Sequence, residues 1–232
     1  MAPNKPLNPI TEISDPAMQS IQISESERDA FYKVLHNRRD VRREFKPDPI
    51  PQDVLMRVLE AAHHAPSVGF MQPWDFILVE DLAVREKIKV GFEVAHAEAA
   101  QMFDAERRET YRGLKLEGIL ESPLGICITC DRQRTGPTVI GRTANPEMDL
   151  YSAVCAVQNL WLAARAENLG VGWVSIIHHD TVRQALGIPD EIMPIAYLCI
   201  GYVSDFHEKP ELEKAGWLPR ADLQSLIHHD QW

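Results

Sequence analysis

The chain has 232 residues, of which 45% are hydrophobic and 25% charged, the ordinary composition of a globular protein. Its 34 acidic residues outnumber its 24 basic residues and give a formal net charge of −10. This balance argues against general binding to nucleic acid or to an anionic membrane, because both need a basic face. The sequence contains neither an apolar run of membrane-spanning length nor an apolar signal-peptide core, which predicts a cytoplasmic protein.

The N-terminal region divides into an arm and a helix. Residues 1–23 hold four prolines and alternate polar with isolated apolar residues, which predicts an extended arm. Ser24 and Glu27 match a capping box, so a helix is expected from there to about Asn37. No repeat or change of composition marks a further boundary, and a single domain is predicted over residues 24–232.

A basic cluster follows this helix between Asn37 and Lys46. Four arginines and a lysine crowd into these ten residues of an acidic protein. Because the planar guanidinium group suits phosphate oxygens, we predict an anion site. The alternative is an exposed loop of ion pairs that cancel one another. Asp40 lies inside the cluster, where it is either a salt-bridge partner or a base held ionised by its neighbours.

The next part of the chain alternates predicted helices, loops and strands. A helix is expected over residues 51–64 and a strand over residues 76–79. The loop between them carries Ser67 and Gln72, in a position where functional residues often lie. From residue 82 to residue 121 the pattern is helical but irregular, and its charged middle is the best candidate for a lid.

Residues 124–130 have the pattern of a buried strand that contains Cys127 and Cys130. Residues three apart on a strand face opposite sides, so the two sulfurs are poorly placed to bind one metal or to form a disulfide. We interpret them, with Cys155 and Cys199, as small core residues. The histidine pairs also lack metal-ligand spacing, and no metal site is expected.

The clearest predicted helix covers residues 149–169 and is expected to stop at Gly170. It is apolar on nearly all sides, which places it in the core or at a subunit interface. The elements expected downstream are an extended segment over 172–177, a short helix over 181–186 and a strand over 195–203. Together these elements indicate an α+β fold.

Two motifs connect the sequence to a known family. The chain resembles the FMN-dependent nitroreductase superfamily in this order of features: helix, Arg38-Arg39-x-x-Arg42, helix, Pro66-Ser67-x-x-x-x-Gln72-Pro73-Trp74, strand. It departs from the superfamily at Asp40, where a serine is usual, and at Phe70, where an asparagine is usual. With residues 172–176 and 216–220, these departures make the chain similar to the branch of 5,6-dimethylbenzimidazole synthases.

The resemblance implies a central, mostly antiparallel sheet flanked by helices, in an intertwined homodimer that binds flavin at its interface. It also implies that reduced FMN is the substrate. In this reaction molecular oxygen is used to fragment and contract the flavin into 5,6-dimethylbenzimidazole, the lower ligand of cobalamin, and erythrose 4-phosphate. A separate NAD(P)H-dependent flavin reductase would supply the reduced FMN. The alternatives are an NAD(P)H-dependent nitroreductase-type oxidoreductase and a flavin-binding protein without turnover.

The same resemblance assigns two catalytic residues. Asp40 is expected to act as a general base near C1′ of the ribityl chain, and the alternative is that it neutralises the adjacent arginines. Ser175 is expected to hydrogen-bond the flavin near N5 and C4a, and the alternative is a serine that caps a strand end.

The expected flavin contacts extend beyond these two residues. The full set of expected flavin-binding residues is Arg38, Arg39, Asp40, Val41, Arg42, Ser67, Gln72, Leu116, Ser175 and Arg220. The arginines would hold the phosphate. For Ser67 and Gln72 the alternative is a role in shaping their own loop, and for Leu116 it is simple core packing.

Overall fold

The computed structural model describes residues 22–232, and nearly all of the predicted arm over residues 1–23 lies outside them. The described strands form one four-stranded sheet: β1 (Trp74–Val79), β2 (Leu124–Asp131), β3 (Leu169–Val174) and β4 (Ile192–Tyr202). The strand order is β1-β2-β4-β3, and each neighbouring pair is antiparallel. Strand β3 therefore lies at an edge, where its free backbone groups can pair with another segment.

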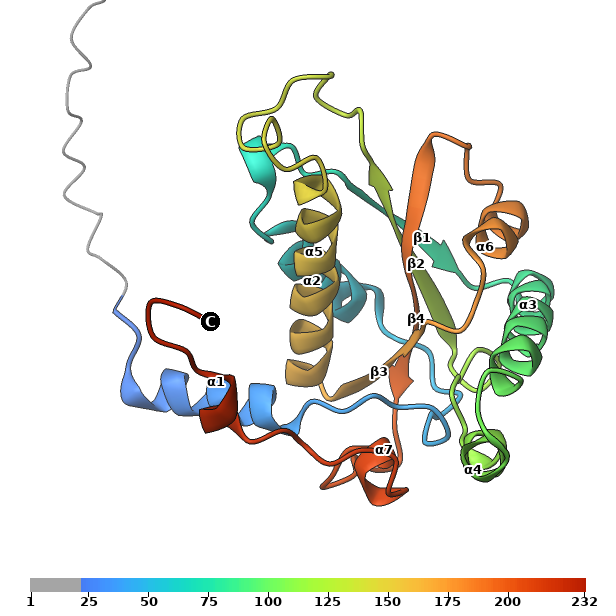
Figure 1. Cartoon of the computed structure of the whole chain (residues 1–232). Coiled ribbons are helices and arrows are strands. Elements are labelled where there is room, and N and C mark those ends of the chain that lie inside the picture. Colours follow the sequence, from blue (N-terminus) through green and yellow to red (C-terminus); the bar gives the residue numbers. More distant parts are fainter. Residues whose placement is uncertain (1–21) are drawn as a thin grey trace, which may run out of the picture.

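Helices cover both faces of this sheet (Figure 1). Helices α2 (Gln52–His63) and α5 (Met148–Ala166) cover one face, and α3 (Leu82–Ala100) and α6 (His179–Leu186) cover the other. The remaining helical elements are α1 (Glu25–Asn37), η1 (Val68–Phe70), α4 (Ala105–Gly113), α7 (Glu211–Lys214) and η2 (Leu223–Leu226). The predicted α+β class is confirmed, as is the antiparallel sheet flanked by helices.

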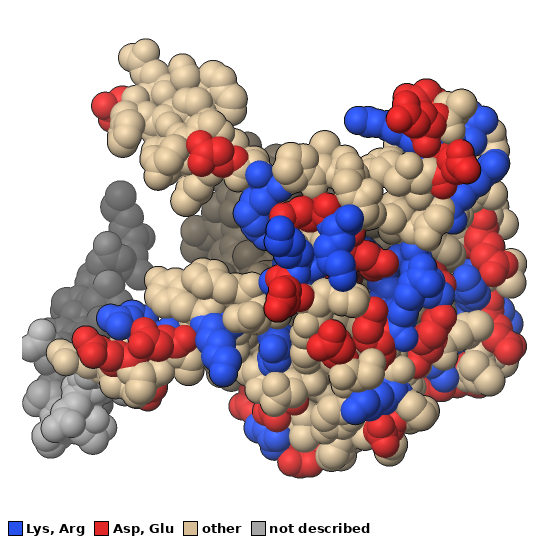
Figure 2. Space-filling model, turned by 90° about the horizontal axis from the view of Figure 1, so that it is seen from below, with Lys and Arg blue, Asp and Glu red and all other residues tan. Residues whose placement is uncertain are grey.

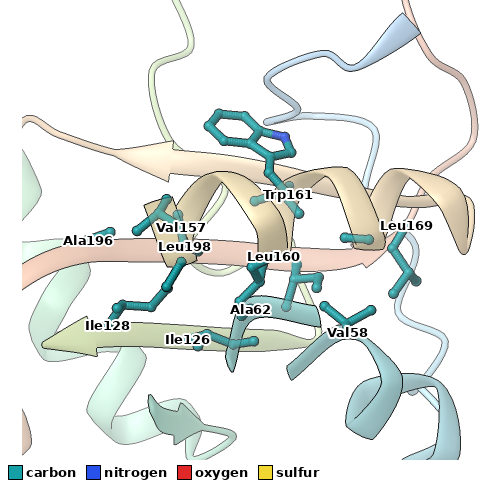
Figure 3. Packing of buried hydrophobic residues seen from close by; sticks show 14 of the residues in the cluster. Val58, Ala62, Ile126, Ile128, Val157, Leu160, Trp161, Leu169, Ala196 and Leu198 are labelled. Atoms are coloured by element: carbon teal, nitrogen blue, oxygen red, sulfur yellow. The ribbon is translucent and has the colours of Figure 1, made fainter. Parts of the chain in front are cut away.

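The alternation of side chains along β2 creates two hydrophobic cores. Ile126 and Ile128 pack against α2 and α5, as Figure 3 shows, whereas Cys127 packs on the side of α3. Cys130 lies opposite Trp74 of the first core. The prediction that Cys127 and Cys130 face opposite sides as buried core residues is therefore confirmed, and both thiols are free.

The predicted helix over residues 149–169 is wrong at its C-terminal end, because α5 stops at Ala166. Asn168 adopts a φ of 58°, the left-handed conformation that commonly ends a helix. Asn168 thus takes the role assigned to Gly170, and Gly170 belongs to β3. Within residues 22–232, neither this helix nor any other is long and apolar enough to cross a membrane.

Helix α1 confirms the predicted capping box. The Ser24 hydroxyl accepts a bond from the Glu27 amide, and the Glu27 carboxylate accepts one of 2.8 Å from the Ser24 amide. No residue of α1 is buried, and Phe31 is 55% exposed. Phe31 and Val34 line an apolar groove between α1, α2 and α5. The apolar side of α1 is therefore only partly covered within the described residues.

Candidate active site

The basic cluster lies against the free edge of β3. The Val41 amide donates to the Val171 carbonyl at 3.0 Å, and Asp40 forms a parallel bridge with Val171. A Cβ atom on Gly172 would overlap the carbonyl oxygen of Val41, so the glycine permits this close approach. The basic cluster thus packs against Gly170-Val171-Gly172 of β3, and this contact fixes the position of Asp40.

Asp40 is held by one backbone group and one cation. Its Oδ1 accepts a hydrogen bond of 3.1 Å from the Trp173 amide, and its Oδ2 pairs with Arg42 Nη2. Burial raises the pKa of Asp40 above its usual value, although Arg42 and the Trp173 amide act in the opposite direction. The side chain keeps 31% of its surface exposed. The carboxylate is therefore both accessible and more basic than an ordinary aspartate.

Arg42 does not point a free guanidinium at solvent. Its side chain is 9% exposed and lies between two carboxylates, Asp40 and Glu211, the second at 3.2 Å from Nη1. Glu211 is 169 positions away in the sequence and begins α7. No local motif points to Glu211, because its partner Arg42 lies far away in the sequence.

Arg39 bonds to backbone carbonyl groups. Its Nη1 donates to the carbonyls of His36 at 2.8 Å and Arg38 at 2.7 Å, and its Nη2 donates to the carbonyl of Glu208. Its buried Nε has no partner among the described residues. Arg39 therefore ties the end of α1 to the segment that precedes α7.

Arg38 and Arg220 lie near each other, and they belong to the cations of this region that form no ion pair within residues 22–232. The Arg38 guanidinium lies over the Trp161 ring, 4.6 Å from its centroid. Burial lowers the pKa of Arg38; the negative charge of Asp40 opposes this shift, and the positive charges of Arg39 and Arg220 add to it. Figure 2 shows the face that carries α1 and α7, where Lys and Arg side chains gather with Asp and Glu among them. Two close cations without carboxylate partners are suited to an anion such as a phosphate.

The loop with Ser67 and Gln72 lies at the other end of α5 (Figure 1). The Ser67 hydroxyl accepts a bond of 3.1 Å from the Gln72 amide, and Val68 donates to Ser152 in the first turns of α5. By contrast, Trp161 of α5 donates to the Arg39 carbonyl. The rise of about 1.5 Å per residue separates the two contact points by roughly 14 Å. Within this chain the two predicted motifs are not brought together.

Ser175 and Leu116 come from two different segments near β3. Ser175 is exposed just beyond the end of β3 and lines a pocket with Trp173 and Tyr197. Leu116 is half-buried against the second core, and the chain two residues later, at Gly118, touches the Arg42 carbonyl. Both residues lie near the segment that presents Asp40, and their contact with a flavin remains a prediction.

The fold and the sequence both define the class of this protein. The chain belongs to the nitroreductase family, whose sequence pattern matches residues 35–202. A solved structure of oxidised iodotyrosine deiodinase bound to FMN and 3-iodo-L-tyrosine superposes with a TM-score of 0.68. It is 22% identical and covers 87% of this chain and 100% of its own, a likeness that concerns the fold.

Particular members of the family are more similar in sequence. The 5,6-dimethylbenzimidazole synthase of Rhodospirillum rubrum is 44% identical over 193 residues, which are 83% of this chain and 91% of the relative. A protein of the same name from Rhodobacter capsulatus is 38% identical over 197 residues, 85% and 95% of the two chains. The predicted resemblance to this branch of the nitroreductase family is confirmed.

Proposed function

We propose that this protein converts reduced FMN, with molecular oxygen, into 5,6-dimethylbenzimidazole, erythrose 4-phosphate and a third fragment that retains the pyrimidine-ring atoms of the flavin. The observation that carries the proposal is the carboxylate of Asp40 inside a cluster of arginines, at a position where the wider family usually has serine. The names of the relatives at 44% and 38% identity support the same reaction. A role in making the lower ligand of cobalamin follows from the product.

The arrangement of cations fits the phosphate end of FMN. Arg38 and Arg220 have no carboxylate partner within the described residues, and Arg39 has an unpartnered Nε. We assign the phosphate chiefly to these three residues. Arg42, already held by Asp40 and Glu211, would contact the start of the ribityl chain. Bound reduced FMN supplies the carbon skeleton and the electrons of the reaction.

Asp40 is suited to remove a proton beside this phosphate site. Fragmentation of the ribityl chain requires proton removal near C1′, and a partly exposed carboxylate with a raised pKa can take that proton. Ser175, beyond the end of β3, is assigned to the flavin ring, where its hydroxyl would orient N5. Val41 and Leu116 would contact the flavin from the segments on either side.

A second copy of the chain would complete the site. Ser67 and Gln72 lie near the first turns of α5, roughly 14 Å along the helix from the basic cluster. The surface around them exposes large apolar side chains, with Phe70 at 81%, Ile140 at 86% and Tyr151 at 53%. A homodimer that buries this surface would place the Ser67 loop of one protomer at the Asp40 site of the other.

The reaction itself is tested with reduced FMN under anaerobic conditions. The protein is mixed with reduced FMN, oxygen is admitted, and the products are separated by chromatography. We expect 5,6-dimethylbenzimidazole and erythrose 4-phosphate in equal amounts. Catalytic consumption of NAD(P)H with a nitroaromatic acceptor and no benzimidazole would indicate the reductase alternative. Oxidation of FMN with peroxide release alone would indicate a flavin-binding protein.

The composite site predicts complementation between two inactive variants. Asp40→Asn and Ser67→Tyr protomers are denatured together and refolded, so that heterodimers form by chance. Each heterodimer then has one site with both changes and one site with neither. We expect about a quarter of the wild-type activity, because half of the dimers carry one intact site of two. Refolded samples of each variant alone serve as controls, and no recovery in the mixture would indicate that each protomer builds its own site.

A further inference from the structure

The Arg42 guanidinium is shared between two acids that come from distant parts of the chain. Nη2 pairs with Asp40, and Nη1 lies 3.2 Å from Oε2 of Glu211. The three groups together carry one negative charge when both acids are ionised. Arg42 is 9% exposed, so water screens these interactions weakly. The two carboxylates therefore share one weakly screened cation.

Glu211 is fixed by contacts other than its bond to Arg42. Three residues before it, the Glu208 carbonyl accepts a bond from Arg39. Six residues after it, Trp217 packs edge-to-face on Phe103, with ring centroids 5.3 Å apart, and Tyr111 of α4 lies at 6.5 Å from the same ring. Helix α7 is thus anchored at both ends. The Glu211 carboxylate is brought to Arg42 by the fold.

The sharing limits how tightly Arg42 can hold Asp40. A guanidinium and a carboxylate bind most strongly as a bidentate pair, with two parallel N–H···O bonds. Here one amino group of Arg42 is directed at Glu211, which leaves the other for Asp40. The negative charge of Glu211 also opposes the ionisation of Asp40. Both effects favour the protonated form of Asp40 and make its carboxylate a stronger base.

We propose that Glu211 is a positioning residue, which acts through Arg42 to set how readily Asp40 accepts a proton. The inference rests on the proposed function, in which Asp40 is the general base. It adds a residue that neither motif contains and a physical role for the C-terminal helix α7. A base that is too strongly paired with Arg42 would be ionised but weak, and proton removal would be slower.

Several charged or titratable groups face Asp40, whereas Glu211 is linked to it through Arg42. Arg38 and Arg42 of the same segment lower the pKa of Asp40, as does the Trp173 amide of β3. On β4, burial raises the pKa of the Cys199 thiol to about 12, so this group is neutral near pH 7. Removal of the Glu211 charge therefore leaves Asp40 facing cations, a hydrogen-bond donor and a neutral thiol.

The test compares Glu211→Gln with Glu213→Gln in the full chain. Glutamine keeps the shape of the side chain and an acceptor for Arg42 but removes the charge. Glu213 is two residues away in α7 and faces Lys209 at 4.0 Å, so its variant is a matched control. The first measurement is the titration of the Asp40 carboxyl carbon by nuclear magnetic resonance in flavin-free protein. The signal is assigned by its loss in Asp40→Asn.

We expect the midpoint of the Asp40 titration to fall by about one pH unit in Glu211→Gln and to stay unchanged in Glu213→Gln. The acid limb of the rate of benzimidazole formation should move to lower pH by the same amount. The plateau rate should fall about threefold, because the base is weaker. A purely structural role for Glu211 would lower the rate without moving either midpoint.

An Asp40 midpoint that is the same in Glu211→Gln and the wild type would overturn the inference. Equal shifts in both variants would also overturn it. So would tighter binding of reduced FMN by Glu211→Gln with an unchanged acid limb, because that result would mean that Glu211 repels the phosphate instead of acting on Asp40. Because the titration needs no turnover, a shifted midpoint in a protein that makes no benzimidazole would support the link between Glu211 and Asp40 and refute the proposed function.

Discussion

Asp40→Asn is expected to lower the rate of 5,6-dimethylbenzimidazole formation by at least about a hundredfold. Asparagine keeps an oxygen for the 3.1 Å bond from the Trp173 amide but cannot take a proton at neutral pH. Reduced FMN should bind nearly as well as to the wild type, because Arg38 and Arg220 are untouched. The measurements are single-turnover product formation and an anaerobic titration with reduced FMN. Product formation near the wild-type rate would remove Asp40 from the chemistry.

The stability of the same variant separates a chemical effect from misfolding. Burial raises the pKa of Asp40 in the folded state, so between the unfolded and folded pKa values the folded chain binds more protons. Stability from this group is therefore lost as the pH rises through that window, and above it the ionised carboxylate is a net cost. Asp40→Asn should melt at the same temperature as the wild type or higher, with Arg42 still paired to Glu211. A much lower melting temperature would attribute the loss of activity to folding.

The sequence predicts the position of the basic cluster, but it does not predict which partner each arginine binds. Arg38, Arg39 and Arg42 are alike as a motif, and all three were predicted to bind phosphate. In the fold Arg39 bonds to the Glu208 carbonyl and Arg42 to Glu211, both 169 positions away. These partners depend on the tertiary contact between the segment around α7 and the basic cluster, and no local pattern predicts that contact.

Sequence motifs predict the structure correctly where the stabilising hydrogen bonds join residues that are close in the sequence. The capping box at Ser24 is confirmed, because its bonds join residues three apart. The end of α5 was misplaced, because Asn168 takes the left-handed conformation for which glycine is the usual signal. The role of the Ser67 loop stays a prediction, and the local motif does not reveal that the loop contacts the opposite end of α5 from the basic cluster.

Gly172→Ala is expected to destabilise the protein by about 3 kcal/mol, a large effect for a single methyl group. The added Cβ atom would overlap the backbone carbonyl of Val41, which cannot rotate away as a side chain could. The basic cluster would have to move off the edge of β3. Because the Trp173 amide holds Asp40 at this edge, benzimidazole formation should fall further than the loss of folded protein explains.

Two other glycines provide a graded control for this prediction. A Cβ atom on Gly170 would meet the side chains of Val203 and Val41, which can adjust, so Gly170→Ala should cost less than Gly172→Ala. Gly113 has nothing within 4 Å of its Cβ position and ends α4, so Gly113→Ala should be neutral or stabilising by up to about 1 kcal/mol. The free energy of unfolding in urea gives the ranking. Equal values for Gly172→Ala and Gly113→Ala would mean that the cluster does not lie directly against β3, and the position of Asp40 in the proposed reaction would lose its structural basis.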